Sequence, residues 1–254
     1  MPSLSLIVDS PSLIGLLLLA AFFVGASKGG LPGIGMLAVP VLSLVMSPVN
    51  AAVLLLPIFI LSDTLAVWLY RKEFSLDNIK ILIPAGLLGV GIGWATASLV
   101  SDDLISLLIG MLGVTFCLSI WLGNRASRQP TVSTPARGMF WGTLSGFTSF
   151  VAHAGAPPYQ IYLLPQRLPK MVFAGTTTIV FAAINLAKFI PYANLHPYSS
   201  QTLTVAMALV PAAILGTMVG RLAVTRLGEV RFFQAVQIAL FLICVKLIAD
   251  YFNG

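Results

Sequence analysis

Two stretches, Lys28-Gly-Gly-Leu-Pro-Gly33 and His153-Ala-Gly-Ala-Pro-Pro158, interrupt long apolar runs with a cationic or titratable side chain, glycine and proline. Another proline follows each stretch at the same interval, at Pro40 and Pro165. A helix that breaks at membrane depth leaves backbone groups unsatisfied unless the break lines a cavity. Two matched breaks are typical of transporters that are built from two repeats and bind their substrate at the breaks.

The composition predicts an all-α polytopic membrane protein. Of the 254 residues, 58% are hydrophobic and only 9% are charged, whereas soluble domains carry about 25% charged residues. The uncharged runs over 81–100 and 104–122 are each long enough to cross a hydrocarbon core about 30 Å thick. Membrane segments and short links account for nearly the whole chain. We therefore expect a single integral membrane transporter domain over 1–254, without a soluble catalytic domain.

Several other classes of protein are disfavoured. The net charge of +6 does not indicate nucleic-acid binding, because the Lys and Arg residues cluster in short loops, as the positive-inside rule describes. The two cysteines, Cys117 and Cys244, lie within different apolar runs and predict neither a disulfide framework nor a metal site. The chain also lacks the Gly-x-x-x-x-Gly-Lys-Ser/Thr motif that binds nucleotide phosphates. We therefore expect no cofactor and no use of ATP.

The chain divides into two similar halves. Segment 123–137 holds arginines, prolines and hydroxyl residues and reads as a linker between internal repeats 12–122 and 138–250. Residues near the breaks match at a spacing of 125, and later glycines and prolines match at a spacing of 127. Each half is predicted to contain a short apolar pair around its break and then three longer spans. These segments are 12–27, 34–47, 50–70, 81–100 and 104–122, then 138–152, 156–166, 172–191, 200–220 and 232–250.

Charge placement favours inverted repeats. Each short pair is either a broken, re-entrant hairpin or two short crossings. If each pair returns to its own side, the halves are inverted and all basic loops face the cytoplasm. If each pair makes one net crossing, the basic residues are split between the two sides. The positive-inside rule favours the first arrangement, in a cell inner membrane with both termini outside and linker 123–137 in the cytoplasm. The loop residues in question are Arg71, Lys72, Lys80, Arg125, Arg128, Arg137, Arg167, Lys170, Arg221, Arg226 and Arg231.

Four ionisable groups lie inside apolar runs, namely Lys28, Asp63, His153 and Lys188. A charge near the bilayer centre costs at least about 2.5–3.5 kcal/mol, so such a group faces a cavity or a partner. Lys28 and His153 occupy the breaks, while Asp63 and Lys188 lie in the first long span of each half at a spacing of 125. A pseudo-two-fold axis would bring all four together near the midplane. Cations and the free N–H groups of helix starts would then form an anion site.

Small and polar neighbours complete the predicted substrate site. Asn185 lies one turn before Lys188 and can donate a hydrogen bond to the same anion. The run 176–178 of threonines either lines the site or bonds back to its own helix. Glycines beside the breaks would let the backbone approach the anion closely. These glycines are Gly29, Gly30, Gly33 and Gly155.

Structural alternatives stay open for these groups. Asp63 and Lys188 either form an ion pair between the halves, or Asp63 carries a proton that is coupled to transport. His153 is either a titrating group of the site or a neutral packing residue. The Gly89-x-x-x-Gly93 and Gly216-x-x-x-Gly220 spacings predict close helix packing rather than substrate binding.

At these residues the chain resembles the sulfite exporter TauE/SafE family of membrane permeases, over nearly its whole length. The resemblance implies the transport of sulfur-containing anions such as sulfite, sulfonates and related organosulfur compounds. Ala156 departs from the pattern, because this family often has a second glycine there, and the added methyl group would narrow the approach to the substrate. The matching segments are Gly25-Ala-Ser-Lys-Gly-Gly-Leu-Pro-Gly33, Asp63, Trp68-Leu-Tyr-Arg71, Gly146-Phe-Thr-Ser-Phe-Val-Ala-His-Ala-Gly155, Pro157-Pro158, Tyr162-Leu-Leu-Pro165, Phe173-Ala-Gly-Thr176, Asn185 and Lys188.

Together these features predict a secondary transporter of a small anion that works by alternating access and is not an enzyme. The residues themselves indicate only a small anion, and the resemblance implies that it is a sulfur oxyanion. Its expected partners are that anion and the lipid bilayer, and a homodimer is one assembly that we consider. An anion channel is the main alternative. An intramembrane hydrolase that uses Ser149, four residues before His153, is a weaker one.

Overall fold

A computed structural model describes residues 11–253 of the chain, except for 32, 100, 123–131 and 227–229. Within these residues every regular element is a helix, and each of the ten predicted segments is present. The elements of the first half are α2 (Pro11–Lys28), η1 (Ile34–Leu37), α3 (Ala38–Ser43), α4 (Pro48–Tyr70), α5 (Leu76–Thr96), η2 (Ala97–Leu99) and α6 (Asp102–Trp121). Those of the second half are α7 (Pro135–Ala152), α8 (Ala156–Leu163), η4 (Leu164–Gln166), α9 (Lys170–Leu195), α10 (Ser200–Arg226) and α11 (Val230–Asn253).

Among the described residues, six helices are long and apolar enough to cross a membrane. They are α2, α4, α5, α6, α9 and α10. This confirms the prediction of an all-α polytopic membrane protein.

Local sequence explains where several helices begin. Ser47 Oγ accepts a hydrogen bond from the Asn50 N–H at 3.3 Å, and Pro48 fills the first position of α4. Ser101 Oγ caps α6 in the same way. Helix α5 begins at Leu76, before the predicted start at 81. The prediction followed the apolar run and so left out the first turn, which is helical but carries polar side chains.

Both breaks lie where the sequence predicts them. Helix α2 ends at Lys28, and Gly30 follows with a φ of 116°, a conformation that residues with a Cβ rarely adopt. Helix α7 ends at Ala152, and His153 caps it in the left-handed region with a φ of 51°. The Ala154 N–H then donates to the Thr148 carbonyl at 3.2 Å, which closes the helix end. Of the predicted break residues, Pro32 lies outside the described residues.

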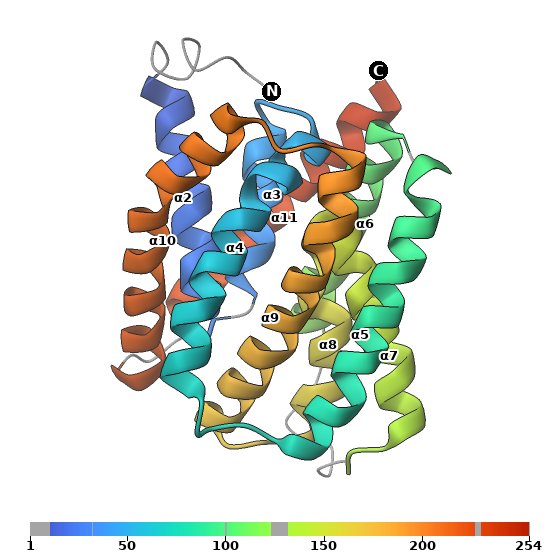
Figure 1. Cartoon of the computed structure of the whole chain (residues 1–254), viewed down its shortest axis with the longest axis vertical. Helices are drawn as coiled ribbons and strands as arrows, with labels where there is room; N and C mark the ends of the chain where they lie inside the picture. The colour runs from blue at the N-terminus through green and yellow to red at the C-terminus, as the bar shows by residue number, and fades with distance from the viewer. Residues whose placement is uncertain (1–10, 32, 100, 123–131, 227–229, 254) are drawn as a thin grey trace.

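The helices of the two halves run in opposite directions (Figure 1). Helix α4 descends from the top of the view whereas α9 rises from the bottom, and α5 and α10 are opposed in the same manner. Helix α2 also descends, and the chain returns upward through α3 before α4 begins. These directions are the ones that inverted repeats with re-entrant pairs require, although the repeat relationship itself stays a prediction.

Packing between the halves is reciprocal. Helix α2 of the first half packs against α10 of the second, and α7 of the second half packs against α5 of the first. Helices α4 and α9 pack against each other in the middle of the view, and α6 packs against α11. The two breaks and the two central helices are therefore brought to the same region.

Most of the basic loop residues that the structure describes lie at one end of the helices. The end of α4 and the starts of α5, α7 and α9 lie at the bottom of Figure 1, together with the end of α10. The start of α6, with Asp102 and Asp103, lies at the opposite end. Arg125, Arg128, most of linker 123–137 and the terminal residues of the chain lie outside the described residues.

Candidate functional site

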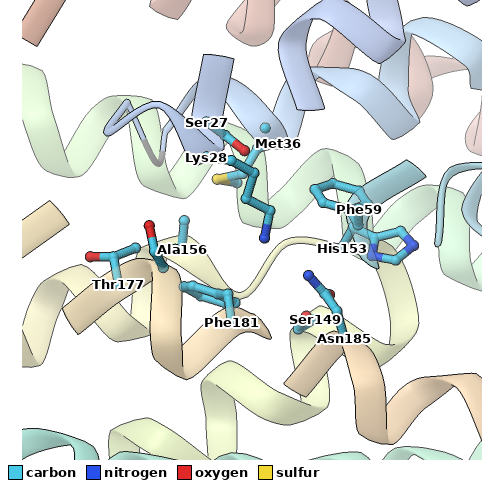
Figure 2. Close-up of a pocket in the computed structure, with 12 residues that line it drawn as sticks. Ser27, Lys28, Met36, Phe59, Ser149, His153, Ala156, Thr177, Phe181 and Asn185 are labelled. Carbon is cyan, nitrogen blue, oxygen red and sulfur yellow. The ribbon is translucent and has the colours of Figure 1, made fainter. Parts of the chain in front are cut away.

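A cavity of about 40 Å³ lies where the two breaks meet the central helices. A buried water needs roughly 10–15 Å³ of such space, so the cavity holds a few waters or a small ion. Figure 2 shows the side chains of both halves converging on it, with the Lys28 amine pointing into the gap from the end of α2. The lining residues are Ser27, Lys28, Gly35, Met36, Phe59, Ser149, His153, Ala156, Thr177, Thr178, Phe181 and Asn185.

Lys28 is held by a carboxylate from the central helix α4. Its Nζ lies 2.7 Å from Asp63 Oδ1, and the two side chains are only 6% and 5% exposed. Asn185 on α9 donates from Nδ2 to the other oxygen, Asp63 Oδ2, at 2.7 Å. The Lys28 ammonium also lies over the rings of Phe59 and Phe181, 5.1 and 5.9 Å from their centroids. These contacts fix one buried ion pair at the edge of the cavity.

Lys188 makes a second, separate cluster. Its Nζ donates to the Ser149 carbonyl and to Ser149 Oγ, both at 3.1 Å. Its third contact is His153 Nδ1 at 2.7 Å. The other imidazole nitrogen, Nε2, lies 3.0 Å from the Ala52 carbonyl. A carbonyl can only accept, so Nε2 carries the proton and Nδ1 accepts from a Lys188 ammonium, which describes a neutral imidazole.

Of the two buried lysines that the structure describes at this site, one has a carboxylate in contact. Around the cavity, the buried ionisable side chains within the described residues are Lys28, Asp63, His153 and Lys188. Asp63 pairs with Lys28, whereas Lys188 contacts the carbonyl and the hydroxyl of Ser149 and a ring nitrogen of His153. A buried charge is stable only when it is compensated. Lys28 meets this condition through Asp63, and Lys188 is held through its hydrogen bonds to Ser149 and His153.

The structure separates the predicted site residues into two layers. Lys28, His153 and Asn185 line the cavity, whereas Asp63 and Lys188 stand behind these side chains and are not part of the lining. The suggested ion pair between Asp63 and Lys188 is wrong as a direct contact, because Lys28 takes the carboxylate. The Lys28 side chain extends from the end of α2 toward α4, so its ammonium can contact the Asp63 carboxylate.

The predicted glycines are not part of the cavity lining. A Cβ on Gly29 would lie 2.4 Å from the Thr217 carbonyl oxygen on α10. One on Gly155 would lie 2.7 Å from the Ser145 carbonyl oxygen, which belongs to α7. A Cβ on Gly33 would meet only the Phe116 ring, and Gly30 serves the backbone turn through its positive φ. Gly29 and Gly33 therefore approach other helices, Gly155 packs against the cavity-lining Phe181 ring, and Gly35 is the glycine that lines the cavity.

Sequence reasoning missed the aromatic walls. Phe59 precedes Asp63 by one helical turn, and Phe181 precedes Asn185 in the same way. Side chains at that spacing share a helix face. Asp63 and Asn185 could therefore have indicated that Phe59 and Phe181 face the same site. Phe59 additionally stacks on the His153 ring, with centroids 4.6 Å apart.

One open alternative, the role of the threonine run, has an answer in the geometry. Thr176 and Thr177 bond back to the carbonyls of Val172 and Phe173 at 2.6 and 2.7 Å, yet Thr177 also lines the cavity. The helix start at α8 offers fewer N–H groups than expected, because two prolines occupy its first turn.

The pair Ser149 and His153 does not form a nucleophile–base contact. Lys188 lies between the two side chains and contacts both Ser149 Oγ and His153 Nδ1. The serine hydroxyl thus has an ammonium donor, rather than an imidazole base, as its neighbour. This geometry gives no support to a hydrolase that would use the Ser149–His153 pair.

A second, larger cavity of about 200 Å³ lies toward the end of the molecule where α4 begins and α9 ends. Its lining is mostly apolar and includes Ala52, Phe150, Tyr192 and His196. The Tyr192 hydroxyl donates to the Phe150 carbonyl. Because Ala52 also binds His153, a layer made by Ala52, Phe150 and His153 lies between the two cavities.

One family model matches this chain, that described as sulfite exporter TauE/SafE, and the match covers residues 17–247. Among curated proteins and among solved structures, none matches the chain.

Proposed function

The chain belongs to the sulfite exporter TauE/SafE family, and from that premise we propose that it is a secondary transporter for a small sulfur oxyanion, such as sulfite or a small sulfonate. Membership identifies a membrane transporter rather than an enzyme. The choice among sulfur anions and the alternating-access mechanism are part of the proposal.

The observation that carries the proposal is the Lys28 side chain, which lines a small buried cavity. Two lysines and a single aspartate lie around it, and the Lys28 ammonium lines it directly. An ammonium has three donors, and Asp63 accounts for one contact of the Lys28 group. This ammonium can bind an oxyanion, and Asp63 is its partner in the structure described.

Each predicted site residue then has a distinct role. Lys28 binds the anion, and the Asn185 amide, on the opposite wall of the cavity, can donate to it as well (Figure 2). Lys188 contributes its charge from behind the wall, and it orients His153 and Ser149 through its three hydrogen bonds. All three of its donors are used, so Lys188 positions the lining rather than contacting the anion.

The two cavities support alternating access. The larger cavity lies toward one end of the molecule, and the layer with His153 and Phe150 lies between it and the smaller one. A transporter exposes its site to one side at a time by rocking one repeat against the other. In this arrangement the layer would open toward that end, and helices α4 and α9, which carry site residues from the two halves, would move against each other.

The test is uptake of sulfite and of small sulfonates into vesicles that contain the purified protein. We expect saturable uptake by the wild type and at least a roughly tenfold loss in Lys28→Ala, which corresponds to about 1.4 kcal/mol of lost binding free energy. Lys246→Ala is the matched control, because that lysine is exposed and pairs with Asp250 on the surface of α11.

Two outcomes would overturn the proposal. One is a Lys28→Ala protein that transports normally at a normal level in the vesicles. The other is unsaturable conductance by the wild type, which would identify an anion channel instead.

A further inference from the structure

On the premise of the proposed function, we infer that Asp63 occupies the anion's place on Lys28, so that an anion binds only when Asp63 takes up a proton. One proton would then move with each anion.

The contact geometry makes Asp63 a built-in competitor for the substrate. Its Oδ1 lies 2.7 Å from Lys28 Nζ, the ammonium that lines the cavity, although Asp63 itself is not part of the lining. The Asn185 amide fixes the other oxygen at 2.7 Å, so the carboxylate is held in position against the lysine. Within the described residues, Oδ1 has no hydrogen-bond partner besides this ion pair.

Electrostatics then links the two ligands. With Asp63 ionised, an anion on the same ammonium would lie a few ångströms from a second negative charge in a buried, weakly screened site. Like charges at such a separation cannot both be ionised without a large cost. A proton on Asp63 removes the repulsion and releases Lys28 from its strongest partner.

The step balances without any further reactant. A proton from water adds to a carboxylate oxygen of Asp63, and the charge-assisted contact between Lys28 and Oδ1 weakens. A Lys28 N–H then donates to an oxygen of the entering anion. The cavity gains one negative and one positive charge, so its net charge is unchanged.

The groups that face Asp63 from the packed helices favour this residue as the proton acceptor. Helix α2 contributes Lys28, and α9 contributes Asn185 and, further along, Lys188. His153, at the end of α7, is already hydrogen-bonded at both ring nitrogens, to Lys188 and to the Ala52 carbonyl. It therefore has no ring nitrogen left for a further proton without the loss of one of these bonds.

The remaining neighbours of α4 bring no second carboxylate to this point. Arg221 of α10 lies at the far end of α4, where it contacts the Leu69 carbonyl and the Tyr70 ring. The acidic residues of α6, Asp102 and Asp103, stand at the first positions of that helix, and α3 has no ionisable side chain. Asp63 is therefore the one carboxylate that the described residues place at the cavity.

The first test measures the binding of methanesulfonate to the purified full-length protein between about pH 5 and about pH 9. A sulfonate remains a monoanion over this range, so any pH dependence comes from the protein. For the wild type, we expect Kd to weaken by about tenfold per pH unit once Asp63 is ionised, as proton linkage requires. We expect Asp63→Asn, which keeps the shape but cannot ionise, to bind with nearly the same Kd at every pH.

Asp250→Asn is the matched control, since it removes the carboxylate of the exposed pair with Lys246. It should follow the wild type. If Asp63→Asn instead kept the wild-type slope, a different group would be the proton acceptor and the inference would be wrong.

The second test needs no variant and so does not depend on how Asp63→Asn folds. Methanesulfonate is added to the wild type in a weakly buffered solution, and the pH change is read with an indicator. We expect uptake of about one proton per bound anion at alkaline pH. Binding without proton uptake would overturn the coupling while leaving the proposed function intact. An absence of binding and uptake at every pH would overturn the proposed function as well.

Discussion

Lys188 is the most deeply buried charge of this molecule within the described residues, with 0% of its surface exposed. Its three hydrogen bonds reach only neutral acceptors. Burial of an ammonium costs several kcal/mol, which such bonds offset only in part. A residue of this kind costs stability.

We therefore expect Lys188→Met to be neutral or stabilising, by about 0–2 kcal/mol, while transport falls at least roughly tenfold. Methionine keeps much of the length of the side chain but removes the charge. One of the three acceptors of Lys188 keeps a donor without it, since the Ser149 carbonyl also accepts from the His153 N–H at 3.0 Å. Thermal unfolding in detergent checks the expected stability, and vesicle uptake checks the expected loss of transport.

Lys246→Met is the matched control, because Lys246 is 57% exposed and should change neither property much. A clear loss of stability in Lys188→Met would show that the three hydrogen bonds outweigh the cost of burial. The charge would then be a structural requirement.

At the scale of the helices, glycines determine how closely the two halves approach. A Cβ on Gly89 of α5 would lie 2.0 Å from the Thr143 carbonyl oxygen on α7. A Cβ on Gly216 of α10 would lie 2.2 Å from the Phe22 carbonyl oxygen on α2. The sequence prediction of close packing at these glycines is confirmed, and the equivalent helices of the two halves use it in the same way.

Gly89→Ala should lower the free energy of unfolding by about 1–3 kcal/mol, because the methyl group meets backbone atoms that cannot move aside cheaply. Gly91 lies on the same helix, and a Cβ there would meet nothing within 4 Å. Gly91→Ala should therefore stabilise slightly, by about 0.5–1 kcal/mol, through the better helix propensity of alanine. Melting temperatures of the two variants in the same detergent compare them directly, and equal effects would contradict the packing described.

At the scale of the whole molecule, the basic helix ends lie together. Arg71 and Lys72 follow α4, Arg137 lies in the first turn of α7, and Lys170 begins α9, all at the bottom of Figure 1. The positive-inside rule predicts that this end faces the cytoplasm.

Single cysteines can test this orientation. Leu99, which is 78% exposed, lies between α5 and α6 at the opposite end from the exposed Lys72. We expect a membrane-impermeant maleimide to label Leu99→Cys in intact cells and to label Lys72→Cys only after the membrane is opened. The native Cys117 and Cys244 are buried and should contribute little background. The reverse labelling pattern would refute the predicted topology.

Much of the fold could be predicted because its causes are local. Apolar runs of about 20 residues determine spans, and Gly30 and His153 stand where the backbone leaves the helical region. Inside the site, the prediction was right that Lys28, His153 and Asn185 gather at one cavity. The suggested ion pair of Asp63 with Lys188 was wrong, because Asp63 pairs with Lys28. The spacing of 125 residues relates positions along the sequence and does not give the direction in which the side chains point.

The sequence by itself determined the class of the protein, its membrane helices, the two breaks and the few charges that burial makes significant. These follow from hydropathy and from the backbone preferences of glycine and proline, which act over a few residues. Only the tertiary structure decided that Asp63 binds Lys28, that Lys188 holds His153, and that the glycines beside the breaks mostly face other helices. Those pairings depend on how helices that are far apart in the chain cross. The 2.7 Å contact between Lys28 and Asp63 also depends on the direction of both side chains, which the spacing of residues along the sequence does not encode.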